Sequence, residues 1–354
     1  MIPRDDPLFP TMVIGSLPRP EWVVDLINER TQGRISEAEA DRLLDDAIPS
    51  VIRMQERAGL DYISDGEWRR ENYARVFADK VGGFVREQAQ RGRTTLSAVV
   101  VGELERRGPI VSDEAQFLRQ HTDRKIIVAL PTPSTVADLM WHPQRSASAY
   151  PTREAFARAC VPILRDEIAA LVALGVDAVQ LDDPLLHRLV RPGYYDVTGQ
   201  LEATVDLAVE TVNMVTEGFE EAFITVHLCH AHGVDEPETP VTSELMGRAV
   251  REMRVDRLAM EFNSQAAQEL QALTDFPANT LLGLGVIHPS CDKIETPELV
   301  VERVQRALAF IDKERLVLNP DCGLSSTARI AGAECAYTKL TAMCQGAELL
   351  RQMF

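Results

Sequence analysis

The sequence predicts an α/β fold, a (β/α)8 TIM barrel in which residues 1–354 form a single domain. Short runs rich in β-branched residues alternate with longer amphipathic stretches from end to end, a pattern typical of repeated βα units around a parallel sheet. Eight such runs are present, which is the number of strands in a closed barrel. The sequence contains no internal repeat and no linker rich in Pro, Gly and Ser that would divide it into two domains.

The predicted strands are short, mainly apolar runs, and most of them end in Gly, Pro, Asp or Cys. Continuous apolar runs of this kind favour strands buried on both faces of a parallel sheet. They occupy residues 11–15, 62–66, 125–131, 178–183, 223–229, 257–262, 280–287 and 315–321.

The stretches between the strands have apolar residues at helical spacing. The clearest helices are predicted at 36–59, 151–175 and 296–313, and each has a Ser or Thr near its start that can cap the first turn. The segment 84–122 breaks the rhythm, because apolar and polar residues alternate around residues 96–112. This alternation favours a β-hairpin inserted after the second barrel strand.

The composition excludes several classes of protein. Hydrophobic residues make up 45% and charged residues 26%, as in globular proteins, and no apolar run is long enough to cross a bilayer. The formal net charge of −17 disfavours binding to nucleic acid or to an anionic membrane surface. The first residues lack the basic and apolar regions of a secretory signal, so we expect a cytoplasmic protein whose six cysteines are reduced.

His227 and Cys229 mark a candidate metal site. They end the predicted strand 223–229, and side chains two residues apart on a strand point to the same face. Glu261 lies in an apolar run, where an unpaired carboxylate carries a large desolvation cost that a metal ion would remove. Cys322 follows the last predicted strand, in a turn that would aim its thiolate inward. These four residues offer nitrogen, sulfur and oxygen donors suited to zinc.

Other readings of the metal-site residues remain open. A His-x-Cys pair alone is equally consistent with two buried structural residues, and His230 and His232 compete with His227 because they lie just beyond the same strand. Cys291 follows the strand 280–287 and is ambiguous. The remaining cysteines lie at helical spacing among Ala and Leu, which favours burial as small apolar side chains: Cys160, Cys335 and Cys344.

Two carboxylates are candidates for binding a cationic group such as a substrate ammonium. Glu67 follows the second strand, while Asp182 and Asp183 end the fourth. Adjacent strand residues point in opposite directions, so only one of the two aspartates faces the mouth of the barrel. The alternative role of these acids is a structural salt bridge to the neighbouring basic residues Arg69 or Arg70.

Ser16 and two basic clusters are candidates for binding anionic groups. Ser16 follows the first strand and offers a hydroxyl with nearby backbone N–H groups for a carboxylate, although a simple loop turn explains it equally well. Basic residues gather at Arg69 and Arg70 and again at Arg188 and Arg191. Either cluster could meet an anionic small molecule, and the alternative is ordinary solvated surface charge.

Six motifs taken together resemble the cobalamin-independent methionine synthase family, specifically its catalytic C-terminal barrel. They occur in the family's order and span essentially the whole chain, which makes the combination specific although each motif alone is not. The motifs are IGSLPRP, DGEWRREN, QLDDP, VHLC, MEF and LNPDCGL. The resemblance implies the barrel type that this family shares with uroporphyrinogen decarboxylase.

The resemblance also implies a reaction and the residues that carry it. It implies a zinc ion that promotes ionisation of the homocysteine thiol for attack on an activated methyl group, giving methionine. The residues that match the zinc ligands are His227, Cys229, Glu261 and Cys322. The residues that match the homocysteine site are Ile14, Gly15, Ser16, Glu67 and Asp182, with the two acids on the amine.

The methyl donor is not defined by the resemblance. Long members of the family carry a second, N-terminal barrel that helps to bind polyglutamylated methyl-folate, and this chain has no room for one. We therefore expect an enzyme like 5-methyltetrahydropteroyltriglutamate-homocysteine S-methyltransferase, supplied by methyl-folate or by a methyl-carrier protein. His288 neighbours the position of the family's proton-donating histidine, and Arg188 stands where an acidic residue contacts folate.

Two other functions compete with methyl transfer to homocysteine. One is a zinc-dependent thiol alkyl transfer similar to that of epoxyalkane:coenzyme M transferases. Coenzyme M has no amine, so the presence of both Glu67 and Asp182 favours an amino-acid thiol. The other is a zinc-binding barrel with a regulatory or chaperone role, which the substrate-type residues at the mouth disfavour.

Overall fold

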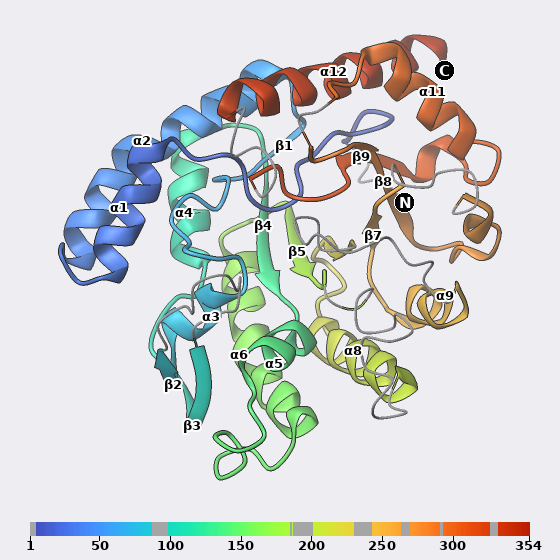
Figure 1. The fold of residues 1–354 in the computed structure, drawn as a ribbon. Helices are drawn as coiled ribbons and strands as arrows, with labels where there is room; N and C mark the ends of the chain where they lie inside the picture. The colour runs from blue at the N-terminus through green and yellow to red at the C-terminus, as the bar shows by residue number, and fades with distance from the viewer. Residues whose placement is uncertain are drawn as a thin grey trace.

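A parallel sheet of seven strands forms the centre of the structure, in the order β1-β4-β5-β6-β7-β8-β9 (Figure 1). Every residue of these strands is buried except for partial exposure at Lys125 and Met260, because helices cover the outer face of the curled sheet. The strands are β1 (Tyr62–Ile63), β4 (Lys125–Pro131), β5 (Ala178–Asp182), β6 (Ile224–Leu228), β7 (Arg257–Met260), β8 (Leu281–Ile287) and β9 (Leu316–Pro320).

The structure is a computed structural model that describes most of the chain. The described residues are 5–86, 98–184, 186, 201–229, 243–262, 270–290, 293–325 and 332–354. Five residues considered from the sequence lie outside them: Arg188, Arg191, His230, His232 and Cys291.

The two edges of the sheet meet the same N-terminal segment. Thr11 forms a parallel bridge with Leu318 of β9, and its carbonyl accepts a hydrogen bond from the backbone N–H of Tyr62 in β1 at 3.0 Å. The predicted strand 11–15 is present only as this bridge. The Asp61 carboxylate accepts hydrogen bonds from both the N–H and the hydroxyl of Thr11 at 2.8 Å, and so takes a donor that a longer ladder would use.

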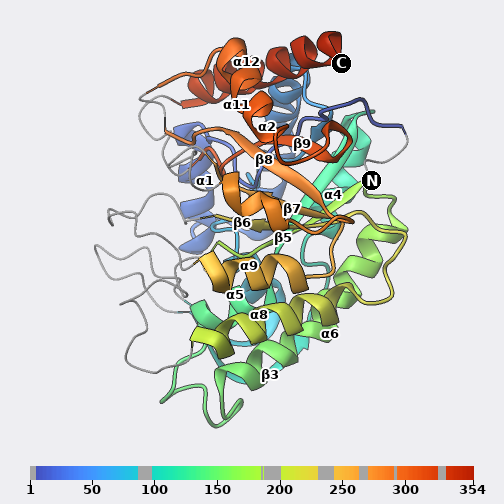
Figure 2. The same ribbon diagram turned by 90° about the vertical axis from the view of Figure 1, so that its right-hand side faces the viewer.

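The helices lie outside the sheet and alternate with its strands (Figures 1 and 2). Three of them, α2, α6 and α11, begin where the sequence predicts, because a Ser or Thr at the N-cap accepts a hydrogen bond from the backbone three residues on, and α5 is capped in the same way by Thr132. The α-helices are α1 (Glu21–Thr31), α2 (Glu37–Ala58), α3 (Arg75–Lys80), α4 (Ser112–His121), α5 (Pro133–Met140), α6 (Arg153–Ala173), α8 (Leu201–Thr216), α9 (Ser243–Glu252), α11 (Pro297–Ala307) and α12 (Gly332–Met353). Two short 3-10 helices are η1 (Leu270–Asp275) and η2 (Lys313–Arg315).

A second, antiparallel sheet lies between β1 and β4 in the sequence. It consists of β2 (Val81–Arg86) and β3 (Ala98–Arg106), in the region where the sequence predicts a hairpin. A Cβ on Gly83, whose φ is +99°, would lie 2.6 Å from the Glu103 carbonyl. Only glycine therefore fits at this irregular point of the pairing.

Two elements end earlier than their sequences predict, for local reasons. β1 stops before residue 66 because the buried Gln55 side chain takes both backbone groups of Ser64, donating to its carbonyl at 2.6 Å and accepting from its N–H at 3.0 Å. The helix predicted at 296–313 ends at Ala307 in α11, where the chain continues in tight turns that bury Ile311.

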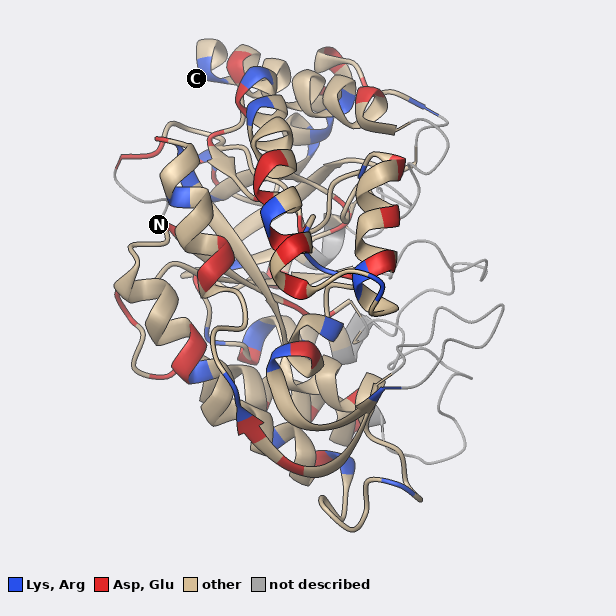
Figure 3. Ribbon diagram, turned by 90° about the vertical axis from the view of Figure 1, so that its left-hand side faces the viewer, with Lys and Arg blue, Asp and Glu red and all other residues tan. Residues whose placement is uncertain are grey.

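The predictions for the helical cysteines can be compared with their burial and bonding in the structure. Cys160 is buried and Cys344 is partly buried, both as free thiols. Cys335 is buried but disulfide-bonded, so the prediction that it is a reduced thiol was wrong. Acidic and basic residues both occur along the helices that cover the sheet (Figure 3). No helix within the described ranges is long and apolar enough to cross a membrane.

Candidate active site and metal centre

The candidate site residues lie where parallel strands end. Asp182 is the last residue of β5, Cys229 follows β6, Glu261 follows β7 and His288 follows β8. Cys322 lies just beyond β9. Because parallel strands all point the same way, their carboxyl ends form one edge, where α/β barrels carry their active sites.

His227, Cys229 and Cys322 form a cluster of candidate metal ligands. One ligand atom from each residue lies within 4.8 Å of the others, and the two Sγ atoms are 3.5 Å apart. Neither cysteine forms a disulfide, which would bring the sulfurs to about 2.05 Å. The strand direction is the reason for this arrangement, because His227 and Cys229 extend from the same face of β6 toward the turn that carries Cys322.

The orientation of His227 is set by a carboxylate. Its Nδ1 lies 3.1 Å from Oδ1 of Asp182, which also accepts a hydrogen bond from the Gln180 amide at 2.8 Å. The other ring nitrogen, Nε2, is buried and has no oxygen or nitrogen partner. A buried imidazole nitrogen beside two thiols fits a metal ligand, held in place by a carboxylate on its far side.

The pKa of His227 also fits the role of a metal ligand. Burial alone lowers the pKa of His227, but the hydrogen bond to Asp182 and the Cys322 thiolate raise it to about 10. The protein thus stabilises positive charge at this position. A divalent metal at Nε2 would supply that charge in place of a proton.

Glu261, the fourth predicted ligand, is placed nearby but outside the cluster. Leu228 pairs with Met260, so Cys229 and Glu261 are the next residues on neighbouring strands. The Glu261 side chain is buried, yet its carboxylate is not among the atoms that lie within 4.8 Å of one another. The structure therefore brings together three of the four predicted ligands.

Glu67 adopts a strained backbone conformation that its neighbours hold in place. Its φ is +58°, which is unusual for a residue with a side chain. Its N–H donates to Asp65 at 2.9 Å, and its carbonyl accepts a hydrogen bond from Arg19 at 2.5 Å. Its carboxylate lies 3.3 Å from Nη1 of Arg70, so one of the two predicted salt-bridge partners is present.

Glu67 also has a perturbed ionisation. Burial raises the pKa of Glu67 to about 7, partly offset by Arg70 and reinforced by the negative charges of Asp182 and Asp65. The influence of Asp182 shows that the two carboxylates chosen from the sequence face the same region. A buried pair of this kind would be stabilised by a cationic group between its members.

Asp182 and Asp183 point in opposite directions, as strand geometry requires. Asp182 faces His227, whereas the Asp183 carboxylate accepts hydrogen bonds from three hydroxyl groups near the start of α5. Asp183 is therefore a structural residue that ties β5 to α5. Its role explains why only one member of the pair is available at the site.

Gly15 and Ser16 lie at the junction of three loops. Gly15 has a φ of +53°, and a Cβ there would lie 3.5 Å from Oε1 of Glu67. The hydroxyl of Ser16 is 2.5 Å from that of Ser325, and its carbonyl accepts a hydrogen bond from the Ser325 N–H. Ile14, on the other side of Gly15, is buried.

Two polar residues at the site, Glu114 and Tyr73, were not singled out from the sequence. Arg70 donates two hydrogen bonds to Glu114 of α4, at 2.7 and 2.9 Å, in addition to its contact with Glu67. Burial raises the pKa of Tyr73 well above its usual value, and the charges of Asp182 and Cys229 raise it further. The position of Tyr73 in the conspicuous polar stretch after β1 was the only sequence signal.

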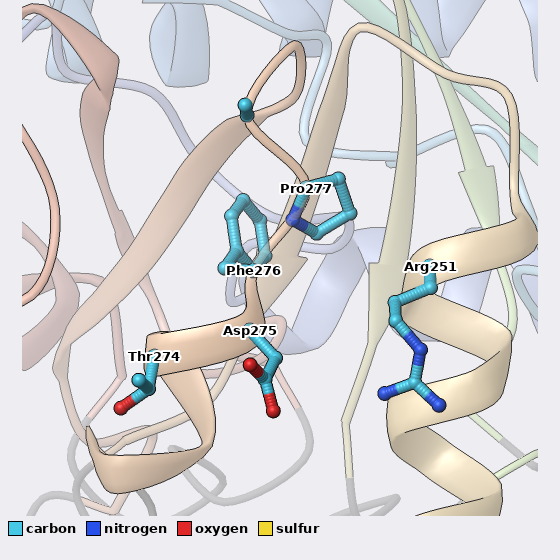
Figure 4. A pocket seen from close by; sticks show the side chains of 6 residues that line it. Arg251, Thr274, Asp275, Phe276 and Pro277 are labelled. Carbon is cyan, nitrogen blue, oxygen red and sulfur yellow. The ribbon is translucent and has the colours of Figure 1, made fainter.

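Two cavities differ in their relation to the site. A cavity of about 10 Å³, with room for roughly one water molecule, is lined by Val13, Gly15, Ser64, Asp65, Glu67, Arg70, Ile127, Ala129 and Gln180. A surface cavity of about 560 Å³ is lined by Arg251, Thr274, Asp275, Phe276, Pro277 and Ala278 (Figure 4). The larger cavity lies where α9 ends and β8 begins, at the opposite ends of the strands, and is therefore not the candidate active site.

The fold and the site define an α/β enzyme that carries a buried imidazole and thiol cluster beside paired carboxylates. The chain matches the family described as cobalamin-independent synthase, catalytic domain, over residues 9–349. It belongs to this family, and it is a methyltransferase of methionine biosynthesis.

Relatives with known names agree over nearly the whole chain. A methionine synthase of Thermococcus kodakarensis is 30% identical over 350 residues, covering 98% of this chain and 94% of that protein. A methionine synthase of Pyrococcus horikoshii is 29% identical with the same coverage. A B12-independent methionine synthase from Shewanella sp. W3-18-1, solved with selenomethionine, has the same fold, with a TM-score of 0.77, 24% identity and coverage of 98% of this chain and 99% of that one.

Proposed function

We propose that the protein transfers a methyl group to the thiol of homocysteine and so produces methionine. The observation that carries the proposal is the cluster of His227, Cys229 and Cys322, whose ligand atoms lie within 4.8 Å of one another beside Asp182. The relatives named methionine synthase support the same reaction.

Zinc is the metal that we propose for this cluster. The buried Nε2 of His227 and the thiols of Cys229 and Cys322 form a nitrogen and sulfur donor set that suits zinc. Glu261, the next residue on the neighbouring strand, is our proposed fourth ligand. A zinc ion bound there would supply a Lewis acid that favours ionisation of a thiol at neutral pH.

The amino acid part of the substrate is assigned to the residues around Glu67. We propose that Glu67 and Asp182 hold the ammonium group, since both carboxylates are buried and the charge of Asp182 raises the pKa of Glu67. Ile14, Gly15 and Ser16 would hold the carboxylate through the backbone N–H groups and the Ser16 hydroxyl. This arrangement orients the thiol toward the cluster, which is the positioning that methyl transfer requires.

His288 is our proposed proton donor. The Ser290 N–H donates a hydrogen bond to Nδ1 of His288 at 3.0 Å, which places the proton of a neutral ring on Nε2. When the thiolate sulfur bonds to the methyl carbon, the bond from that carbon to the donor breaks and the donor atom needs a proton. We propose methyl-folate as the donor, while a methyl-carrier protein has no support from the described residues or the relatives.

The proposal extends to the architecture. With the segment at Thr11 hydrogen-bonded to both β9 and β1, we propose a closed (β/α)8 barrel in which residues 11–15 take the eighth strand position. Residues 1–354 would form this single domain, with β2 and β3 as an inserted hairpin. The cytoplasmic location stays a prediction of the sequence.

A substrate comparison tests the proposed function. The purified protein, assayed for bound zinc, is supplied with homocysteine or coenzyme M and with methyl-folate, methylcobalamin or a simple epoxide in turn. We expect methionine from homocysteine with a methyl donor and no product from coenzyme M. Turnover of coenzyme M with the epoxide alone would refute the proposal in favour of the alkyl transferase.

A further inference from the structure

The loop that carries His288 is fastened by a buried carboxylate. Oε1 of Glu295 accepts a hydrogen bond from the backbone N–H of His288 at 2.9 Å. The same oxygen lies 3.3 Å from Nη1 of Arg303 on α11. Arg303 in turn donates to the carbonyl of Val286, in β8, at 2.6 Å. The Glu295 carboxylate and the Arg303 side chain thereby connect the start of the turn after β8 to its end.

A fully buried lysine on α12 holds the other oxygen of this carboxylate. Nζ of Lys339 lies 2.5 Å from Oε2 of Glu295 and donates to the carbonyl of Lys293 at 2.6 Å. Lys339 is 0% exposed and the Glu295 side chain is 3% exposed. Since α12 packs beside α11 along β8 and β9 (Figures 1 and 2), Lys339 ties the loop to a helix that is itself packed against the sheet.

Stability does not explain this ion pair well. Taking both charges out of water costs about as much as their attraction returns, so a buried pair is often no more stabilising than apolar residues of the same volume. The pair does fix the orientation of the Glu295 carboxylate, because each of its oxygens accepts from a donor of its own. The carboxylate is thereby aimed at the His288 N–H.

We propose that Glu295 and Lys339 are positioning residues that act through His288. They hold its backbone so that Ser290 can donate to Nδ1 and the protonated Nε2 is presented in one orientation. This inference rests on the proposed function, in which His288 donates the proton. Neither residue was singled out by the sequence, since a Lys within an amphipathic helix gives no signal of burial.

Three variants test the proposal: Glu295→Ala, Glu295→Gln and Lys339→Met. We expect Glu295→Ala and Lys339→Met to lower kcat on the order of 10- to 100-fold while the KM for homocysteine changes less than about twofold. Glu295→Gln keeps one oxygen that can accept the His288 N–H, although its NH2 group then faces Lys339, so it should recover part of the kcat that Glu295→Ala loses. Lys313→Met, on η2, where the lysine side chain is 32% exposed, is the matched control and should behave like the parent protein.

The tautomer of His288 gives a readout that does not depend on activity. The ¹⁵N shifts of its ring, assigned with a His288→Gln variant, should report a proton on Nε2 in the parent protein. They should report a mixture of tautomers in Glu295→Ala. If Lys339→Met does not fold, the two Glu295 variants decide the question.

Two outcomes would overturn the inference. One is a folded Glu295→Ala variant with the parent's kcat and ring shifts. The other is equal damage in Glu295→Gln and Glu295→Ala, which would show a general role of the ion pair in folding. A parent protein that lacks methyl transfer but whose His288 shifts still respond to Glu295→Ala would refute the proposed function and leave the positioning role standing.

Discussion

Replacing Glu67 by Gln tests how the site recognises its substrate. Burial raises the pKa of Glu67 to about 7, so below that pH the side chain holds a proton and cannot attract an ammonium group. Above it the carboxylate is ionised. With a pKa of about 7, the ionised fraction rises about tenfold between pH 6 and pH 8. In the parent protein the KM for homocysteine should therefore fall about tenfold over that range.

The Gln variant should lose both the affinity and this pH dependence. A hydrogen bond between charged groups contributes about 1.5–3 kcal/mol, which predicts a KM about 10- to 100-fold higher at pH 8. Gln can adopt the same positive φ at similar cost, so the backbone of the loop should be unchanged. The effect on kcat should be small, because the group binds the ammonium in the ground state as well as in the transition state.

Initial-rate kinetics at several pH values measure this effect. 4-Mercaptobutyrate, which is homocysteine without its amine, is the matched control substrate, and its KM should be similar in the parent and the Glu67→Gln variant. A Gln variant whose KM for homocysteine follows the same pH curve as the parent would contradict the assignment of Glu67.

Three further substitutions address the metal centre and the packing around it. Cys229→Ser should lower bound zinc from about one per chain to a small fraction, measured by elemental analysis, with an unchanged circular dichroism spectrum; full zinc content would refute its role as a ligand. Asp182→Asn should weaken zinc affinity on the order of 10- to 100-fold, measured by competition with a chelator, because it leaves His227 less firmly oriented. Gly323→Ala places a Cβ 3.0–3.2 Å from three atoms of Ser16 and should cost about 1–3 kcal/mol of stability together with a higher KM for homocysteine. Gly108→Ala, which meets nothing within 4 Å, is its neutral control in thermal unfolding.

Three strands in the middle and later parts of the chain were predicted well. The segment 125–131 is β4 with the predicted bounds, and the predicted strands at 178–183 and 280–287 differ from β5 and β8 by one residue. The prediction was least accurate at 11–15 and 62–66. There a side chain from another element, Asp61 or Gln55, takes the backbone groups that a longer strand would have used.

The candidate site was predicted in part. The period of a strand was enough to place His227 and Cys229 on one face, and their proximity to Cys322 follows from the shared edge of a parallel sheet. The sequence did not reveal that Asp182 orients His227. That contact joins residues on different strands, and its geometry depends on the register between them.

The sequence by itself determined the order of the βα units, the polar residues at the strand ends and the motifs of the family, because these follow from local periodicity and residue type. Only the tertiary structure decided which polar groups are buried together. The pKa of Glu67, the pairing of Arg70 with Glu114 and the clamp of Glu295 by Lys339 all arise from desolvation and from contacts between distant segments. Such effects depend on distances in space, which the order of residues along the chain does not specify.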